Sequence, residues 1–158
     1  MRTGNHKYLS SPRALAEFVA AWEACTLTKA DWTHAAHVAV GSYYVVLHPS
    51  TAFERMKSGL LKFNESVGGV NSDTSGYHET LTRLWIDVLA KFTGKHGFTD
   101  PWIAACAAVR QFGESRDLHR LYYNFDVLRS IEARRSWIPP NLNPESDAPS
   151  ATTVSPEL

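Results

Sequence analysis

The chain has few cysteines, and their spacing does not indicate disulfide bonds that would stabilise the fold. Its two cysteines, Cys25 and Cys106, form neither a CxxC pair nor a disulfide framework. Both lie among apolar neighbours, which is typical of buried free thiols in a reducing cytoplasm. The spacing therefore excludes a small disulfide-stabilised scaffold.

The chain also lacks an excess of charge and any long apolar run. Lys and Arg together number 16, as do Asp and Glu, and no stretch is strongly basic, so we expect no nucleic-acid partner. No apolar run approaches the roughly 20 residues that span a bilayer. The polar start Met1–Ser11 has no apolar core of a signal peptide. We expect a soluble cytoplasmic protein with no membrane partner.

Strand signals are missing as well, because no alternating pattern bounded by hairpin turns occurs. Apolar residues recur instead at helical spacing. A chain of 158 residues, 44 % of them hydrophobic, is long enough to bury one core without staples. The sequence predicts one all-α domain, a compact bundle of about five to six helices.

Capping and breaking residues divide this bundle into segments. Pro49 and the Gly68–Gly69 pair end two of the helices, and residues 68–76 are the longest internal interruption. The five expected helix starts are Ser11–Pro12, Thr28–Asp31, Ser50, Asp73–Ser75, and Thr99 or Asp100 with Pro101. Residues 115–123 and 130–136 are expected to add short helical turns.

The ends of the chain differ in composition from its middle. Residues 1–10 are expected to be a flexible N-terminus, and residues 11–142 the helical domain. Residues 143–158 are rich in Pro, Ser, Thr and Glu, with few apolar side chains. Such a segment cannot bury enough surface to offset the entropy of ordering, so we expect a disordered tail.

Three histidines are the most informative feature. His34 and His37 are three residues apart, so on a helix their Cβ atoms lie about 5–6 Å apart on one face. His78 follows a glycine-containing approach at the start of a later helix, and it can join them if the two helices are neighbours. Three protein ligands leave a fourth position open, as in a catalytic metal site. Imidazole suits Zn, Fe, Cu and Ni, so we expect a divalent transition metal without choosing among them.

Two other metal classes are excluded by spacing. A dinuclear carboxylate site needs Glu-x-x-His pairs, and no Glu here has a His three residues later. The segment from His78 begins like the HExxH signature of zinc proteases, but Thr82 stands where the second His is required. What remains is a mononuclear three-histidine site or a set of hydrogen-bonded core imidazoles.

Several residues near the histidines are candidates for supporting roles. Glu79 is either a general base or orienting acceptor, or else the partner of Arg83 in an i,i+4 ion pair. The further pocket candidates are Tyr44, Asn64, Tyr77 and Thr82. The remaining histidines lie near termini or loop ends and are expected to face solvent; they are His6, His48, His96 and His119.

Three segments together resemble a family of small uncharacterised bacterial proteins. They are Trp32–His37 (WTHAAH), Asn71–Thr82 (NSDTSGYHETLT) and residues 132–142. The resemblance covers about residues 12–142, and its most specific part is Gly-Tyr-His-Glu-Thr. It implies a compact bacterial domain and assigns no reaction. Residues 124–127 (NFDV) depart from the Ser and Arg-containing charged residues of the family pattern, so this member need not retain an activity of its relatives. In architecture alone, the histidines also resemble the DinB-like bundles, whose three histidines hold a divalent metal.

The sequence leaves three hypotheses for function. The first is a metal-dependent enzyme that acts on a small molecule by hydrolysis, group transfer or O₂ chemistry. The second is a non-enzymatic helical module that binds a small ligand or a protein partner. The third is a metal-free pocket in which His78 and Glu79 form an acid/base pair. A homodimer is compatible with the sequence, although no heptad pattern specifies one.

Overall fold

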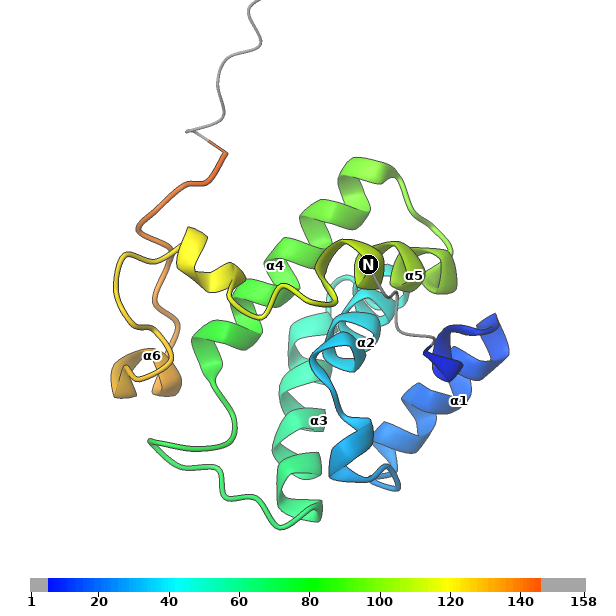
Figure 1. The fold of residues 1–158 in the computed structure, drawn as a ribbon, viewed down its shortest axis with the longest axis horizontal. Helices are drawn as coiled ribbons and strands as arrows, with labels where there is room; N and C mark the ends of the chain where they lie inside the picture. The colour runs from blue at the N-terminus through cyan, green and yellow to red at the C-terminus, as the bar shows by residue number, and fades with distance from the viewer. Residues whose placement is uncertain (1–5, 146–158) are drawn as a thin grey trace, which may run out of the picture.

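Six α-helices and three 3₁₀ turns make up the part of the chain that the computed structural model describes, residues 6–145. No strand occurs in that range, so the all-α prediction is confirmed (Figure 1). The α-helices are α1 Pro12–Glu23, α2 His34–Leu47, α3 Ala52–Ser66, α4 Glu79–His96, α5 Pro101–Phe112 and α6 Ile131–Arg135. The 3₁₀ turns are η1 Lys7–Leu9, η2 Lys29–Asp31 and η3 Leu118–Leu121.

Three helices begin where the sequence predicts. The side chains of Ser11, Asp100 and Ser130 accept hydrogen bonds from backbone N–H groups two or three residues later, and so cap α1, α5 and α6. Each cap satisfies a donor that the first turn of a helix leaves without an internal partner. Proline directly after the cap of α1 and of α5 loses no internal bond at that position.

The predicted start of the second helix is wrong. Thr28 and Asp31 bond each other reciprocally, side chain to backbone, and close the single 3₁₀ turn η2. The turn ends at Trp32, whose ψ of 69° lies outside the helical region. Helix α2 begins at His34, where the Thr33 hydroxyl accepts from the Ala36 N–H at 3.2 Å. The third helix likewise follows Thr51 rather than Ser50.

Helix α2 forms the centre of the bundle. It packs most extensively against α5 and α4, and also against α3. Buried residues occur on every side of it, including Ala36, Ala39 and Val40, which have no exposed surface. A helix that is apolar all round must be enclosed by its neighbours, and this is the position that Figure 1 shows.

A smaller apolar cluster joins α4 to the C-terminal part of the described chain. Leu84 and Val88 of α4 pack there against Tyr123, Val127 and Ala133. Trp137 and Ile138 cover this cluster from outside. The segment after α6 therefore folds back onto α4.

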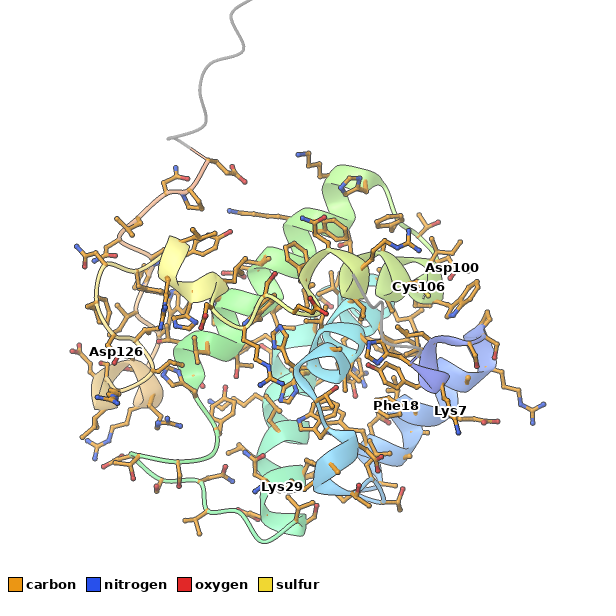
Figure 2. All side chains as sticks on the ribbon, viewed as in Figure 1. Lys7, Phe18, Lys29, Asp100, Cys106 and Asp126 are labelled. Carbon is orange, nitrogen blue, oxygen red and sulfur yellow. The ribbon has the colours of Figure 1, made fainter. Side chains whose placement is uncertain are left out.

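Residues 6–10, expected to be flexible, are packed against the helices. The Tyr8 ring stacks on Phe18 of α1 with 4.3 Å between centroids, and the Trp102 indole N–H donates to the Leu9 carbonyl at 3.0 Å. Figure 2 shows Lys7, Phe18 and Cys106 on one side of the molecule and Asp126 on the other. Residues 1–5 and 146–158, most of the predicted tail, lie outside the described range.

Within residues 6–145, no helix combines the length and the apolar character that crossing a bilayer requires.

Candidate functional site

A cavity of about 520 Å³ lies between one face each of α2, α3 and α4. This volume is in the range of small-molecule sites. The lining positions on each helix recur every three or four residues, which places them on a single face. They are His34, His37, Val38 and Gly41 on α2, Met56, Leu60 and Asn64 on α3, and Leu81, Thr82, Trp85, Ile86 and Leu89 on α4. Connecting segments add Trp32, Thr33, Gly76, Tyr77, His78 and Arg116.

The structure brings most of the predicted site residues to this one cavity. Those that line it are His34, His37, Asn64, Tyr77, His78 and Thr82. Tyr44 and Glu79 are not among the lining residues. Because α2, α3 and α4 are neighbours, residues more than 40 positions apart in sequence meet here.

His37 presents an unprotonated nitrogen without a protein partner. Its Nδ1 lies 2.7 Å from the Thr33 carbonyl oxygen. A carbonyl only accepts, so Nδ1 carries the proton and the Nε2 lone pair has no hydrogen-bond partner within the described chain. Burial lowers the pKa of His37 to about 4, helped by the nearby His34, so the ring is neutral at pH 7.

His34 has the opposite tautomer, and it also presents an unprotonated ring nitrogen without a protein partner. Its Nε2 donates to the Phe112 carbonyl at 3.1 Å, which leaves the Nδ1 lone pair without a partner in the described residues. The ring meets Trp85 edge-on at 5.1 Å between centroids. Burial lowers the pKa of His34, and the positive charge of Arg116 lowers it further.

His78 has both ring nitrogens occupied. Its Nδ1 accepts from the Leu81 N–H at 3.2 Å, and its Nε2 donates to the Val127 carbonyl at 2.9 Å. The first bond makes His78 the N-cap of α4, so this helix begins at Glu79 and the caps predicted at Asp73–Ser75 are wrong. Burial lowers the pKa of His78.

These bonds bear on which residues can hold a metal. Residues 6–145 contain no group of three or more His, Cys, Asp or Glu side chains placed to hold an ion. His34 and His37 each have a lone pair to offer, whereas His78 would have to release both of its hydrogen bonds. The three-histidine site stays a prediction, and the donors that fit it without rearrangement are His34 and His37.

Glu79 is held in its own cluster beside the cavity. The Tyr77 hydroxyl donates to its carboxylate at 2.6 Å, and Lys57 Nζ forms an ion pair with the same oxygen at 3.0 Å. The expected partner Arg83 lies instead over the Phe53 ring, 4.6 Å from its centroid. Burial and the Glu79 carboxylate both raise the pKa of Tyr77. The predicted role of Glu79 as a general base would require the Tyr77 and Lys57 contacts to loosen.

Tyr44 does not line the cavity, although its position on α2 led us to expect it there. Its hydroxyl donates to the Glu23 carboxylate at 2.5 Å, and its ring lies 6.2 Å from that of Trp22. Both partners belong to α1, which covers this end of α2. The cavity face of α2 therefore ends at Gly41.

The loop between α3 and α4 is fixed by an asparagine pair at the cavity wall. The Asn71 Oδ1 accepts from Asn64 Nδ2 and from the Tyr77 N–H, both at 3.0 Å, while Asn71 Nδ2 donates to the Leu61 carbonyl. Gly76 adopts φ 75°, and a Cβ there would lie 2.6 Å from Asn71 Oδ1. The loop therefore delivers Tyr77 and His78 to the cavity in a defined position.

Sequence reasoning missed four residues of this region. Trp32 and Trp85 supply aromatic walls, and Arg116 contributes a positive charge. The position of Trp32 inside the WTHAAH segment was a usable signal, whereas nothing marks Arg116. His119, expected to face solvent, is only 5 % exposed, because η3 packs beside the cluster on α4.

We compared the chain with protein-family models, with curated proteins and with solved structures. No match was found in any of the three comparisons. The candidate site therefore rests on the geometry described above.

Proposed function

We propose that the protein binds a small organic molecule in the cavity between α2, α3 and α4. The observation that carries this proposal is the pair of neutral imidazoles, His34 and His37, whose free nitrogens belong to side chains of one cavity. Each ring is held by a backbone carbonyl, so its free lone pair is oriented before any ligand arrives. A few oriented polar groups within an apolar pocket are typical of a small-molecule site.

The walls support the same proposal. Met56, Leu60, Ile86 and Leu89 supply aliphatic surface, and Trp32 adds an aromatic ring. Surface of this kind favours the burial of an apolar ligand body at about 25 cal/mol per Å². The lone pairs of two imidazoles then select for a ligand that carries a hydrogen-bond donor.

A cavity-filling variant provides the test. Leu81 lines the cavity and is only partly buried, so Leu81→Trp adds volume into the cavity without overfilling the core. Small aromatic compounds would be screened by thermal shift and their affinities measured by calorimetry. We expect the compounds that bind to lose about tenfold or more in affinity in the variant.

The matched control places the same side chain elsewhere on α4. Lys91 is exposed and does not line the cavity, so Lys91→Trp should leave each affinity unchanged. Equal binding to wild type and Leu81→Trp would refute the proposed site. So would a screen in which no compound raises the melting temperature.

A metal-dependent enzyme is the second candidate, favoured by the i,i+3 placement of two free imidazole nitrogens on one cavity. Here His34 and His37 would hold a divalent transition metal, which would polarise or activate a small substrate when bound. The third ligand predicted from sequence, His78, would have to exchange its helix-capping bond for the metal.

Thermal melting with and without metal tests this second candidate. A bound ion raises the melting temperature by mass action, so Zn²⁺, Ni²⁺, Cu²⁺ or Fe²⁺ should stabilise the protein and a chelator should reverse the effect. His34→Gln and His37→Gln should abolish the response, and His96→Gln, at an exposed position, should preserve it. If none of the four ions shifts the melting temperature, the metal-dependent function fails and the small-molecule site remains.

A further inference from the structure

The side chains that line the cavity carry one permanent charge, and it is positive. No Asp or Glu is among the lining residues, and Arg116 is the only Lys or Arg. The three lining histidines are uncharged at neutral pH, because burial lowers the pKa of each. A protein cavity lined in this way repels cations and attracts anions.

The Arg116 guanidinium is free to bind. It forms no ion pair or hydrogen bond within the described residues. It stands on the segment between α5 and η3, where it is exposed to solvent and still lines the cavity. An unpaired arginine is ordinary on a protein surface, but here it sits at a cavity that has no carboxylate to neutralise it. Arginine binds carboxylates through two parallel hydrogen bonds.

The free polar atoms on the cavity side chains are mainly acceptors. They include the lone pairs of His34 Nδ1 and His37 Nε2, and the Asn64 Oδ1, since the Asn64 amide N–H donates to Asn71. The indole N–H groups of Trp32 and Trp85 also lack a partner in the described residues; that of Trp32 is closed off from solvent, and that of Trp85 adds one donor. A ligand that matches this set must bring hydrogen-bond donors to the interior and an acceptor anion to Arg116.

We infer that the ligand is a small aromatic carboxylate that also carries a hydroxyl group. This inference rests on the proposed small-molecule site and specifies its ligand class. The carboxylate pairs with Arg116, the ring lies between the apolar walls, and the hydroxyl donates to the imidazoles of His34 or His37. An aromatic ring suits walls that include Trp32 and Trp85, because ring pairs gain beyond simple area burial.

Three related probes separate the parts of this inference. They are 6-hydroxy-2-naphthoate, its methyl ester, which removes the charge, and 2-naphthoate, which removes the hydroxyl. Affinities would be measured by calorimetry with the full-length protein. We expect the hydroxy acid to bind about tenfold more tightly than its ester and several-fold more tightly than 2-naphthoate, on the scale of one charged and one neutral hydrogen bond.

Two arginine variants test whether Arg116 causes the preference for the acid over its ester. Arg116→Gln should weaken the hydroxy acid about tenfold and leave the ester unchanged, which removes the preference for the anion. Arg120→Gln is the matched control, because Arg120 is exposed, close in sequence and not a lining residue. It should leave both affinities as in the wild type.

The outcomes distinguish this inference from the function on which it rests. If the ester binds wild type as tightly as the acid, or if Arg116→Gln weakens both equally, the anion class is refuted while the small-molecule site stands. If 2-naphthoate equals the hydroxy acid, the hydroxyl role is refuted. If Leu81→Trp leaves the affinity of every probe unchanged, the probes bind elsewhere and both proposals fail together.

Discussion

His78 is the N-cap of α4, because its Nδ1 accepts a hydrogen bond from the Leu81 N–H. In the structure its ring connects the first turn of α4 to Val127, 49 positions away in the chain. The imidazole thus joins two elements as well as lining the cavity.

We predict that His78→Ala destabilises the protein more than His78→Asn. Asparagine retains an acceptor for the first turn of α4, and loss of such a cap costs about 1 kcal/mol. Both variants lose the bond to Val127, so the difference reports the cap alone. Urea denaturation would measure the two free energies of unfolding. Equal values would contradict the capping role.

We also predict that His37 makes the fold sensitive to mild acid. Its pKa is about 4 in the folded protein against an ordinary value of 6.5, so the unfolded chain binds more protons between these values. The free energy of unfolding should therefore fall as the pH drops from about 6.5 to 4, by up to about 3 kcal/mol from this residue. The lowered pKa of His34 acts in the same direction.

The contribution of His37 is isolated by measuring how steeply the free energy of unfolding changes with pH in the wild type and in His37→Gln. His37→Gln does not titrate, so its stability should fall less steeply than that of the wild type over this range. His96→Gln, at an exposed position, should keep the wild-type slope. Parallel curves for wild type and His37→Gln would show that His37 is not held neutral by the fold.

At the scale of helices, alanine substitutions at two glycines should change the free energy of unfolding in opposite directions. A Cβ on Gly59 of α3 would overlap the indole ring of Trp22, whereas a Cβ on Gly94 of α4 would meet nothing within 4 Å. We predict that Gly59→Ala lowers the free energy of unfolding by about 1–3 kcal/mol, because the two helices must separate. Gly94→Ala should raise it by about 0.5–1 kcal/mol, through helix propensity. Thermal and urea denaturation of the pair would show whether α1 and α3 meet at Gly59.

The presence of the main helices could be predicted from the sequence, but the residues at which they begin could be predicted only in part. Ser11 and Asp100 stand directly before proline, and the structure confirms Ser11 as a cap and selects Asp100 over Thr99. Thr28 and Asp31 are also residue types that cap helices, yet their mutual hydrogen bonds close only the single 3₁₀ turn η2. The cap of α4 could not be predicted, because His78 is not a usual capping residue and its ring is held by Val127 from a distant segment.

The site could be predicted to a similar extent. Helical periodicity was enough to place His34 and His37 on one face, whereas His78 reaches the same cavity because α2 and α4 are neighbours, which the sequence did not specify. Tautomers could not be predicted, since they depend on the carbonyls of Thr33, Phe112 and Val127 in three dimensions. Arg116 was missed for a related reason: its segment reaches the cavity only through the packing of α5 on α2.

At the scale of the whole molecule, α6 supports the rim of the cavity from outside. Arg134 donates to the carbonyls of Gly76 and Tyr77 at 2.9 and 3.3 Å, and Arg135 forms an ion pair with Asp73. Figure 1 shows α6 beside the loop that connects α3 to α4. A short helix near the end of the described chain thus fixes the backbone immediately before His78.

We predict that Arg134→Met loosens this loop more than Arg135→Met. The first variant leaves the loop carbonyls of Gly76 and Tyr77, and also that of Leu128, without their charged donor. The second breaks only an exposed ion pair that water can replace. Amide hydrogen exchange across residues 70–82 should be faster in Arg134→Met than in the wild type. Exchange that is unchanged in Arg134→Met would show that Arg134 does not hold the loop.

The docked N-terminal turn gives Cys106 a use as a chemical reporter. Its thiol is partly buried beneath η1, with Sγ 3.9 Å from the Leu9 carbonyl, and burial raises its pKa. A maleimide should therefore label Cys106 slowly, and the rate should increase when Tyr8→Ala removes the ring that holds η1 on Phe18. Cys25, at the far end of α1, provides an internal reference whose labelling should not change. The labelling rate of Cys106 relative to that of Cys25 would report how often η1 moves away from α5.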